Sequence, residues 1–238
     1  MGEFRFKQFA VSDDRSGMKI STDGVLLGAW AAIPEGCRRV ADLGAGSGLI
    51  ALMLAQRLVP ARPDAEIFAM ELDDGACADC RDNAARSPWA ASVETLQGDA
   101  SAVCAGREFD LIVSNPPYFA TGERSASAAR ASARHEASLS ARTVVDIASH
   151  TLSPGGEAAI IAPADTEADL IFHAELSGLK LRRLTRVASR AGRPPLRCLY
   201  RFTRADGPCT VETLDIRDAS GAFSEDYARL TRPFYLNI

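Results

Sequence analysis

The chain lacks any apolar segment long enough to cross a membrane, and it lacks an export signal. No stretch approaches about 18 uninterrupted apolar residues. The opening sequence MGEFRFKQFA has no long apolar core of the kind that signal peptides carry. We therefore expect a cytoplasmic protein that has no membrane partner.

A linker and an internal repeat are also missing from the 238 residues. This length is enough for one α/β domain with a large buried core. We predict a single structural unit, in which residues 36–238 form the main domain and residues 1–35 form an N-terminal extension. The formal net charge of −4 excludes a uniformly basic protein that coats nucleic acid.

Cysteine occurs at only six positions, and these are scattered along the chain. Cys77 and Cys80 form a CxxC pair, but no second CxxC or HxxxH accompanies them. A chain of this length does not need disulfides to stabilise its core. We interpret the cysteines as reduced thiols and expect no metal site; the alternative is a metal or redox role for the CxxC pair.

Strand-like and helix-like segments alternate along the chain from about residue 38. Such alternation predicts a parallel sheet with helices on both faces. The last two strands read as an antiparallel pair, which makes the expected seven-stranded sheet a mixed one in a Rossmann-like α/β fold. The strands are predicted at 38–44, 65–73, 91–99, 109–117, 157–164, 179–189 and 196–204. Helices are predicted at 48–58, 74–87, 140–156 and 166–178.

Two further segments fall outside this alternation. Residues 4–9 are strand-like and residues 22–31 are helix-like, with Ser21 or Thr22 as the residue that caps the helix. Residues 120–136 are small and polar and contain three arginines. A loop of this length in a compact domain is usually functional or disordered.

The sequence ADLGAGSGL places glycines directly between a predicted strand and a predicted helix. Glycine allows the backbone to turn tightly and allows a ligand to approach closely. In open α/β sheets, ligands bind beyond the carboxyl ends of the strands. We therefore predict a ligand site at Gly44, Gly46 and Gly48; the alternative is a tight turn without a ligand.

Acidic residues end the next two strands. Glu71 stands where a carboxylate accepts hydrogen bonds from ribose hydroxyls, and Asp99 can accept from an adenine amino group. Together they indicate an adenosine site. The alternatives are that Glu71 neighbours a helix cap and that Asp99 is a turn residue.

The acid before the first glycine distinguishes two adenosine ligands. The dinucleotide pattern GxGxxG cradles a pyrophosphate, whereas this chain has DxGxGxG with Asp42 in front. A carboxylate there repels a pyrophosphate and suits the ammonium of a sulfonium ligand. We therefore favour S-adenosylmethionine over a nicotinamide dinucleotide, and a nicotinamide-dependent oxidoreductase remains the alternative from another class.

The sequence NPPY follows the strand at 109–117, as Asn115, Pro116, Pro117 and Tyr118. An exocyclic amine on an aromatic ring is a poor nucleophile, because its lone pair is delocalised into the ring. The Asn115 oxygen and the Pro116 carbonyl can accept from its two hydrogens, and the proline rings fix the local backbone. Tyr118 can stack on a planar base. We predict a catalytic pocket here; the alternative is a plain turn.

The motifs DLGAGSG, ELD, GD and NPPYF, in this order, resemble the class I S-adenosylmethionine-dependent methyltransferases that act on amino groups. The segment FRFKQFAVSDDRSGMKISTDGVLLGAW, with ARHE and LTRPFY, is similar to the bacterial tRNA1(Val) (adenine-37-N6)-methyltransferase family. The likeness runs from residue 4 to residue 236. It implies a tRNA substrate, an N6-methyladenosine product and S-adenosylhomocysteine as by-product. Apart from the resemblance, no obligate protein partner is evident in the sequence, and we expect a monomer.

The resemblance also implies which residues contact the cofactor. It suggests that the N-terminal extension packs over the cofactor site, with Lys19, Thr22 and Asp23 near the methionine end. The full set of predicted cofactor contacts is Lys19, Thr22, Asp23, Asp42, Gly44, Ala45, Gly46, Gly48, Glu71, Leu72, Asp99, Ala100 and Asn115.

NPPY alone leaves the substrate open between adenine N6, guanine N2 and a glutamine side chain. Glutamine methyltransferases carry a helical domain before the glycine turn, and about 40 residues are too few for one. DNA adenine methyltransferases carry a larger insertion for target recognition. A guanine-N2 enzyme acting on ribosomal RNA and an RNA-binding protein without catalysis remain alternatives.

Basic residues concentrate between Leu179 and Ala205, where no acid occurs. Arginine suits phosphate because its guanidinium is planar and bidentate; the alternative is a solvated strand face. The predicted RNA contacts are Arg124, Arg130, Arg134, Arg190, Arg193 and Arg197. For His135, beside Glu136, we expect a structural or RNA-contacting role in place of a general base.

Overall fold

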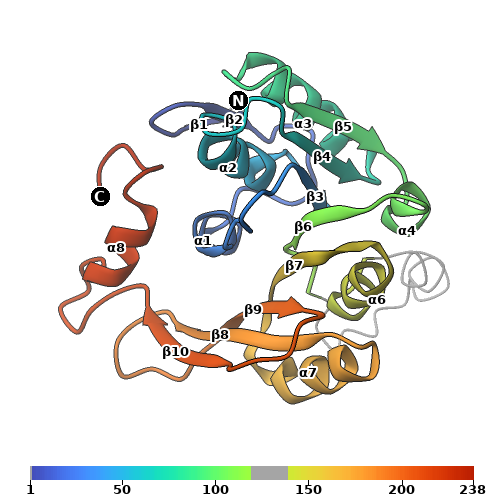
Figure 1. Cartoon of the computed structure of the whole chain (residues 1–238). Helices are drawn as coiled ribbons and strands as arrows, with labels where there is room; N and C mark the ends of the chain where they lie inside the picture. Colours follow the sequence, from blue (N-terminus) through green and yellow to red (C-terminus); the bar gives the residue numbers. More distant parts are fainter. Residues whose placement is uncertain (1, 119–138) are drawn as a thin grey trace, which may run out of the picture.

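The computed structural model describes residues 2–118 and 139–238. Its centre is an eight-stranded sheet in the order β10-β8-β9-β7-β6-β3-β4-β5, with a separate two-stranded sheet near the N-terminus (Figure 1). The strands of the large sheet are β3 (Arg39–Leu43), β4 (Glu66–Glu71), β5 (Val93–Gln97), β6 (Phe109–Ser114), β7 (Leu152–Pro163), β8 (Lys180–Ala188), β9 (Arg197–Thr203) and β10 (Thr210–Asp215).

The predicted mixed sheet is confirmed. Strands β3 to β7 run parallel, and β9 lies antiparallel between β7 and β8. The prediction of seven strands was one too few, because β10 pairs in parallel with β8 at the sheet edge. Only Leu214 of this edge strand is buried. The sequence of β10 therefore lacks the alternation of apolar and polar residues that would predict a strand.

Helices cover both faces of the sheet (Figure 1). One core contains side chains of the first three helices and of the last one, and a second core contains those of the remaining helices. The first set is α1 (Thr22–Trp30), α2 (Leu49–Leu58), α3 (Asp74–Arg86) and α8 (Glu225–Thr231). The second set is α4 (Ala100–Cys104), α6 (Ala141–Thr151) and α7 (Glu167–Leu176), which follows the short helix η1 (Ala164–Thr166).

Strand β3 shows why these residues form a buried parallel strand. Val40 packs in one core and Ala41 and Leu43 pack in the other, and all three are fully buried. Side chains of a strand alternate between its two faces. Because helices cover both faces of a parallel sheet, both sets are apolar. Asp42 is the exception, and it is equally buried.

The N-terminal segment forms the small sheet from β1 (Glu3–Arg5) and β2 (Ala10–Ser12). Two side chains of α3 hold this segment to the domain. Asn83 accepts a hydrogen bond from the Ser12 amide and donates to its carbonyl. Asp79 accepts from the amides of Arg15 and Ser16.

Helix α1 begins where the sequence predicts, with Ser21 as its cap. The Ser21 hydroxyl accepts from the Gly24 amide at 3.3 Å. The helix is buried from Gly24 to Trp30, and the Trp30 indole donates to the Thr185 hydroxyl at 2.8 Å. These contacts place α1 in the same core as α2.

The helix predicted at 140–156 ends earlier, at Thr151, and this is a correction. Strand β7 begins at Leu152 and contains Pro154, Gly155 and Gly156, so these residues do not close the helix. The ladder to β6 shifts register between Phe109 and Leu111. This irregularity accommodates residues that a regular parallel strand disfavours.

The described cysteines are all free thiols, and only Cys209 is exposed. Burial raises the pKa of Cys80 to about 12, which is typical of an unreactive packing residue. No cluster of three or more potential metal-binding side chains occurs in the two described ranges. Within the same ranges, every helix is too short or too polar to cross a bilayer.

Gly48 provides a test of this packing. Its φ is +85°, and an added Cβ would lie 2.7 Å from the Cys80 sulfur. Gly48→Ala should therefore lower the free energy of unfolding by about 1–3 kcal/mol, measured by urea denaturation. Gly155→Ala is the matched control, because a Cβ there has open space. Equal stability of the two variants would contradict this packing.

Candidate active site

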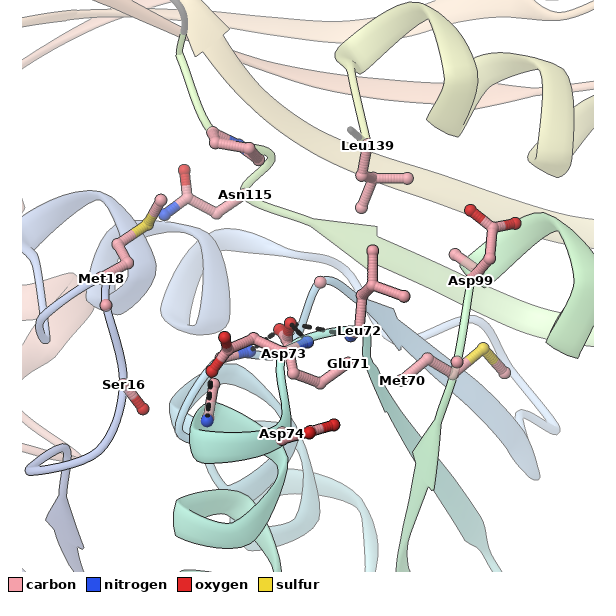
Figure 2. A pocket seen from close by; sticks show the side chains of 17 residues that line it. Ser16, Met18, Met70, Glu71, Leu72, Asp73, Asp74, Asp99, Asn115 and Leu139 are labelled. Atoms are coloured by element: carbon pink, nitrogen blue, oxygen red, sulfur yellow. Dashed lines mark hydrogen bonds between the residues drawn. The ribbon is translucent and has the colours of Figure 1, made fainter. Parts of the chain in front are cut away.

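A cavity of about 620 Å³ opens at the carboxyl ends of the central parallel strands. Strand β3 lies between β4 and β6, so the chain order of the sheet reverses there. Such reversal points are the usual ligand sites of open α/β sheets. The cavity is lined by Ser16, Gly17, Met18, Gly44, Gly46, Met70, Glu71, Leu72, Asp73, Asp74, Ala76, Gly98, Asp99, Ala100, Asn115, Pro117 and Leu139 (Figure 2).

The glycine turn after β3 forms one wall of the cavity. The amides of Gly44 and Ala45 both donate to the Met70 carbonyl at 2.9 Å, which curls the turn over the end of β4. Gly44 and Gly46 have positive φ and line the cavity. Ala45 and Gly48 are not among its lining residues; Gly48 instead caps α2.

Glu71 lies at the end of β4, and backbone groups hold its carboxylate. One oxygen accepts from the Gly46 amide at 2.8 Å, and the other accepts from the amides of Leu72 and Asp73 at 2.8 Å. A carboxylate offers about four acceptor sites. A single site on the oxygen near Gly46 therefore remains for a ligand hydroxyl in this side-chain orientation.

Asp42 lies beneath the glycine turn and is completely buried. One carboxylate oxygen accepts from the Ala51 amide at 2.9 Å, and the other has no partner within the described residues. Burial raises the pKa of Asp42 to about 7, although the Ala51 amide acts in the opposite direction. Asp42 does not line the cavity, so any effect on a ligand passes through the turn or through water.

Asp99 and two leucines form the other end of the cavity. One Asp99 oxygen caps α4 by accepting from the amides of Ser101 and Ala102. Leu72 and Leu139 point toward each other across the cavity (Figure 2). Two apolar side chains that face each other suit a flat ring between them.

The loop before α1 closes the cavity from the N-terminal side. Ser16, Gly17 and Met18 line it, and Asp79 fixes this loop through the Ser16 hydroxyl at 2.8 Å and the Arg15 guanidinium at 2.7 Å. Burial alone would raise the pKa of Asp79, but the hydrogen bonds from Arg15 and Ser16 lower it below its usual value. These three residues were not among the predicted cofactor contacts, although they belong to the N-terminal extension that is expected to pack over the cofactor.

Asn115 and Pro117 of the NPPY sequence line the same cavity as Glu71. The Tyr118 hydroxyl donates to the Asn115 side-chain oxygen at 2.8 Å. Pro116 is buried, and neither it nor Tyr118 is among the lining residues. Burial raises the pKa of Tyr118, and the nearby Asp23 carboxylate adds to this effect, so the hydroxyl stays protonated as a donor.

The residues that the resemblance assigns to the methionine end lie apart from the cavity lining. Lys19 forms an ion pair with Asp13 at 3.6 Å. Thr22 contributes to a separate cavity of about 370 Å³. Asp23 pairs with Arg197 at 2.8 Å.

Acidic residues from other elements form ion pairs with several of the arginines between Leu179 and Ala205, which we call the basic stretch. The ion pairs are Arg183–Glu212, Arg186–Glu167, Arg197–Asp23 and Arg201–Glu157. Arg190 and Arg193 are exposed in the turn between β8 and β9, and Arg190 donates to the Ala219 carbonyl. The other predicted RNA contacts, Arg124, Arg130 and Arg134, lie outside the described residues, as does His135.

The site thus joins a glycine turn, two strand-end carboxylates and an asparagine amide around one cavity. The carboxylates and the glycines suit an adenosine, and the amide oxygen suits an amine donor. With an adenosine held on one side and an amine on the other, the arrangement suits direct group transfer between two bound molecules.

Comparisons with known proteins agree with this geometry. Residues 25–183 match the family model described as methyltransferase small domain. A solved structure of a predicted O-methyltransferase from Agrobacterium tumefaciens superposes with a TM-score of 0.64. It covers 91% of this chain and 100% of that chain at 24% identity, which supports the class I methyltransferase fold.

Two curated relatives are more similar in sequence. A tRNA1(Val) (adenine(37)-N6)-methyltransferase from Aeromonas hydrophila is 43% identical over 235 residues, or 99% of this chain and 98% of that protein. A protein of the same name from Bacteroides thetaiotaomicron is 39% identical, with the same coverage of 99% and 98%. These matches confirm the resemblance seen in the motifs: the chain belongs to the tRNA1(Val) (adenine(37)-N6)-methyltransferase family.

Proposed function

We propose that this chain binds S-adenosylmethionine in the cavity and transfers a methyl group to the exocyclic N6 of an adenine in tRNA. The target is adenine 37 of tRNA1(Val), as the names of the relatives indicate for those proteins. One observation carries the proposal: the Asn115 amide lines the same cavity as the glycine turn and Glu71.

The cavity residues fit the cofactor. A volume of about 620 Å³ lies in the range of small-molecule sites. Glu71 would accept from the ribose, Asp99 from the adenine amine, and Leu72 with Leu139 would enclose the adenine ring. The ionised form of Asp42, with its unpartnered buried oxygen, suits the cofactor's ammonium, through the turn or through water.

S-adenosylmethionine supplies an electrophilic methyl group when bound, and the protein holds the amine that receives it. The Asn115 oxygen accepts one amine hydrogen, and the Pro116 carbonyl accepts the other. Both acceptors return electron density to the nitrogen as its positive charge develops. Much of the rate comes from holding the amine in line with the methyl group, and the product nitrogen loses its proton afterwards.

We further propose that tRNA is held by exposed basic residues around this site. Arg190 and Arg193 lie exposed in the β8–β9 turn, where their guanidinium groups can reach phosphate. The assignment of Arg124, Arg130 and Arg134 to RNA binding remains a prediction. The loop at Ser16–Met18 contributes to the cavity, in keeping with the proposal that the N-terminal extension packs over the cofactor.

The product identifies the reaction directly. The protein is incubated with methyl-labelled S-adenosylmethionine and total RNA, and the RNA is digested to nucleosides. Label should appear in N6-methyladenosine from tRNA. Label in N2-methylguanosine would instead favour the guanine-N2 reaction, and absence of labelled nucleoside would contradict methyl transfer to RNA.

Asn115→Ala should reduce methyl transfer by about 100- to 1000-fold, because it removes one acceptor of the amine. Cofactor binding, measured by calorimetry, should survive, with a loss of affinity much smaller than the loss of activity. Asn237→Ala is the matched control, since this asparagine is exposed near the C-terminus. Unchanged activity of Asn115→Ala would rule out the acceptor role.

Asp42→Asn should change how stability depends on pH. The pKa of Asp42 is about 7 in the folded protein and about 3.9 in the unfolded chain. The folded state therefore binds the extra proton, and its stability falls as pH rises from about 4 to about 7.

The variant lacks this titration. Without cofactor, its stability relative to that of the wild type should therefore increase by roughly 2.5 kcal/mol between pH 5 and pH 8. Urea denaturation at the two pH values measures the difference. The same difference at both pH values would contradict a buried, unpaired Asp42 carboxylate.

A further inference from the structure

Three segments that are distant in sequence meet beside the acceptor pocket. They are the first turn of α1, the start of β9 and the residues that follow β6. Each contributes one polar side chain to a chain of contacts, namely Asp23, Arg197 and Tyr118. The chain of contacts ends at Asn115.

Asp23 fixes the Arg197 guanidinium in one orientation. The Arg197 Nε atom donates to the Asp23 carboxylate at 2.8 Å, and Nη1 donates to the Leu196 carbonyl at 2.9 Å. The side chains of Asp23 and Arg197 are 19% and 34% exposed, so water screens this pair less than a surface pair. With two of its nitrogens engaged inside the protein, Arg197 is a poor candidate for a mobile phosphate contact.

The guanidinium fixes the Tyr118 ring in turn. Its central carbon lies over the ring, 4.8 Å from the ring centroid, which is a cation–π contact. One face of the Tyr118 ring is therefore occupied, and a planar base would have to stack on the other face. The Tyr118 hydroxyl donates to the Asn115 oxygen at 2.8 Å and so orients the amide.

We propose that Asp23 and Arg197 are positioning residues for methyl transfer, which hold Tyr118 and, through it, the Asn115 amide in the orientation that receives the target base. This inference rests on the proposed function. It gives Asp23 and Arg197 a role other than contacts to the cofactor and to RNA phosphate. The Asp23 carboxylate also neutralises a cation that would oppose the positive charge developing on the target amine.

Arg197→Lys is the central test. Lysine keeps the positive charge but loses the planar group that stacks on the ring. At saturating tRNA, kcat should fall by about tenfold or more, while the KM for tRNA and the Kd for cofactor stay within about twofold. Asp23→Asn should lower kcat similarly, because it releases the guanidinium. The kcat of the double variant should be no lower than that of the more impaired single variant, because Asp23 and Arg197 act through one contact.

Arg186→Lys is the matched control. Arg186 lies on β8 and forms an equally close ion pair with Glu167, but the described residues place no aromatic ring of the site against it. The kcat of Arg186→Lys should match that of the wild type. Thermal unfolding shows whether each variant folds. If Arg197→Lys does not fold, Arg197→Gln takes its place, because glutamine retains a planar hydrogen-bond donor.

Two other roles for these residues give different results. If Arg197 contacts phosphate, Arg197→Lys stays active, and Arg197→Gln raises the KM for tRNA and reduces the salt slope by about one. If Asp23 holds the cofactor, Asp23→Asn weakens cofactor binding. Either result would overturn the inference while leaving the proposed function intact, whereas an inactive wild type would contradict the proposed function itself.

A spectroscopic measurement separates positioning from general damage. An anticodon stem-loop carries 2-aminopurine at the target position, where stacking on an aromatic ring quenches its fluorescence. The wild type and Arg186→Lys should quench it equally, and Arg197→Lys should quench it less at equal saturation. Equal quenching by all three proteins would overturn the role of Arg197 in orienting Tyr118.

Discussion

The parallel pairing of β3 with β4 on one side and β6 on the other is the constraint on which the site depends. Because parallel strands end at the same edge, the residues that follow these three strands meet in one place. The glycine turn, Glu71 and Asn115 therefore line one cavity although they are distant in sequence. Helices on both faces hold the strands in register around two mainly apolar cores, and Asp42 is a buried acid of β3 in the interior of the sheet.

Polar groups at this edge are held mainly by backbone atoms and by each other. Glu71 accepts from the glycine turn, and Asp99 caps a helix. Asn115 receives a hydrogen bond from Tyr118. Fixed dipoles of this kind reduce the reorganisation that a reaction requires. The Asp23–Arg197 ion pair similarly places a fixed guanidinium over the Tyr118 ring.

Local patterns predicted most of the fold and the members of the site that follow strands. The order of elements, the antiparallel pair and the family were evident from strand ends, glycines and NPPY. The edge strand β10 was missed because only Leu214 points inward. Ser16–Met18 were not among the predicted contacts, because the part of the N-terminal extension that reaches the cavity depends on Asp79, a contact that no local pattern encodes. The basic stretch looked unpaired because its acids, such as Asp23, belong to distant segments.

In the proposed reaction, the Asn115 oxygen accepts a hydrogen bond from the amine that is methylated. A crystal structure of the protein with S-adenosylhomocysteine and an anticodon stem-loop would show this contact. We expect the exocyclic amine of the target base at about 2.7–3.2 Å from the Asn115 oxygen, with the ring of the base stacked on Tyr118. A base bound elsewhere, or an Asn115 amide turned away from the amine, would contradict it.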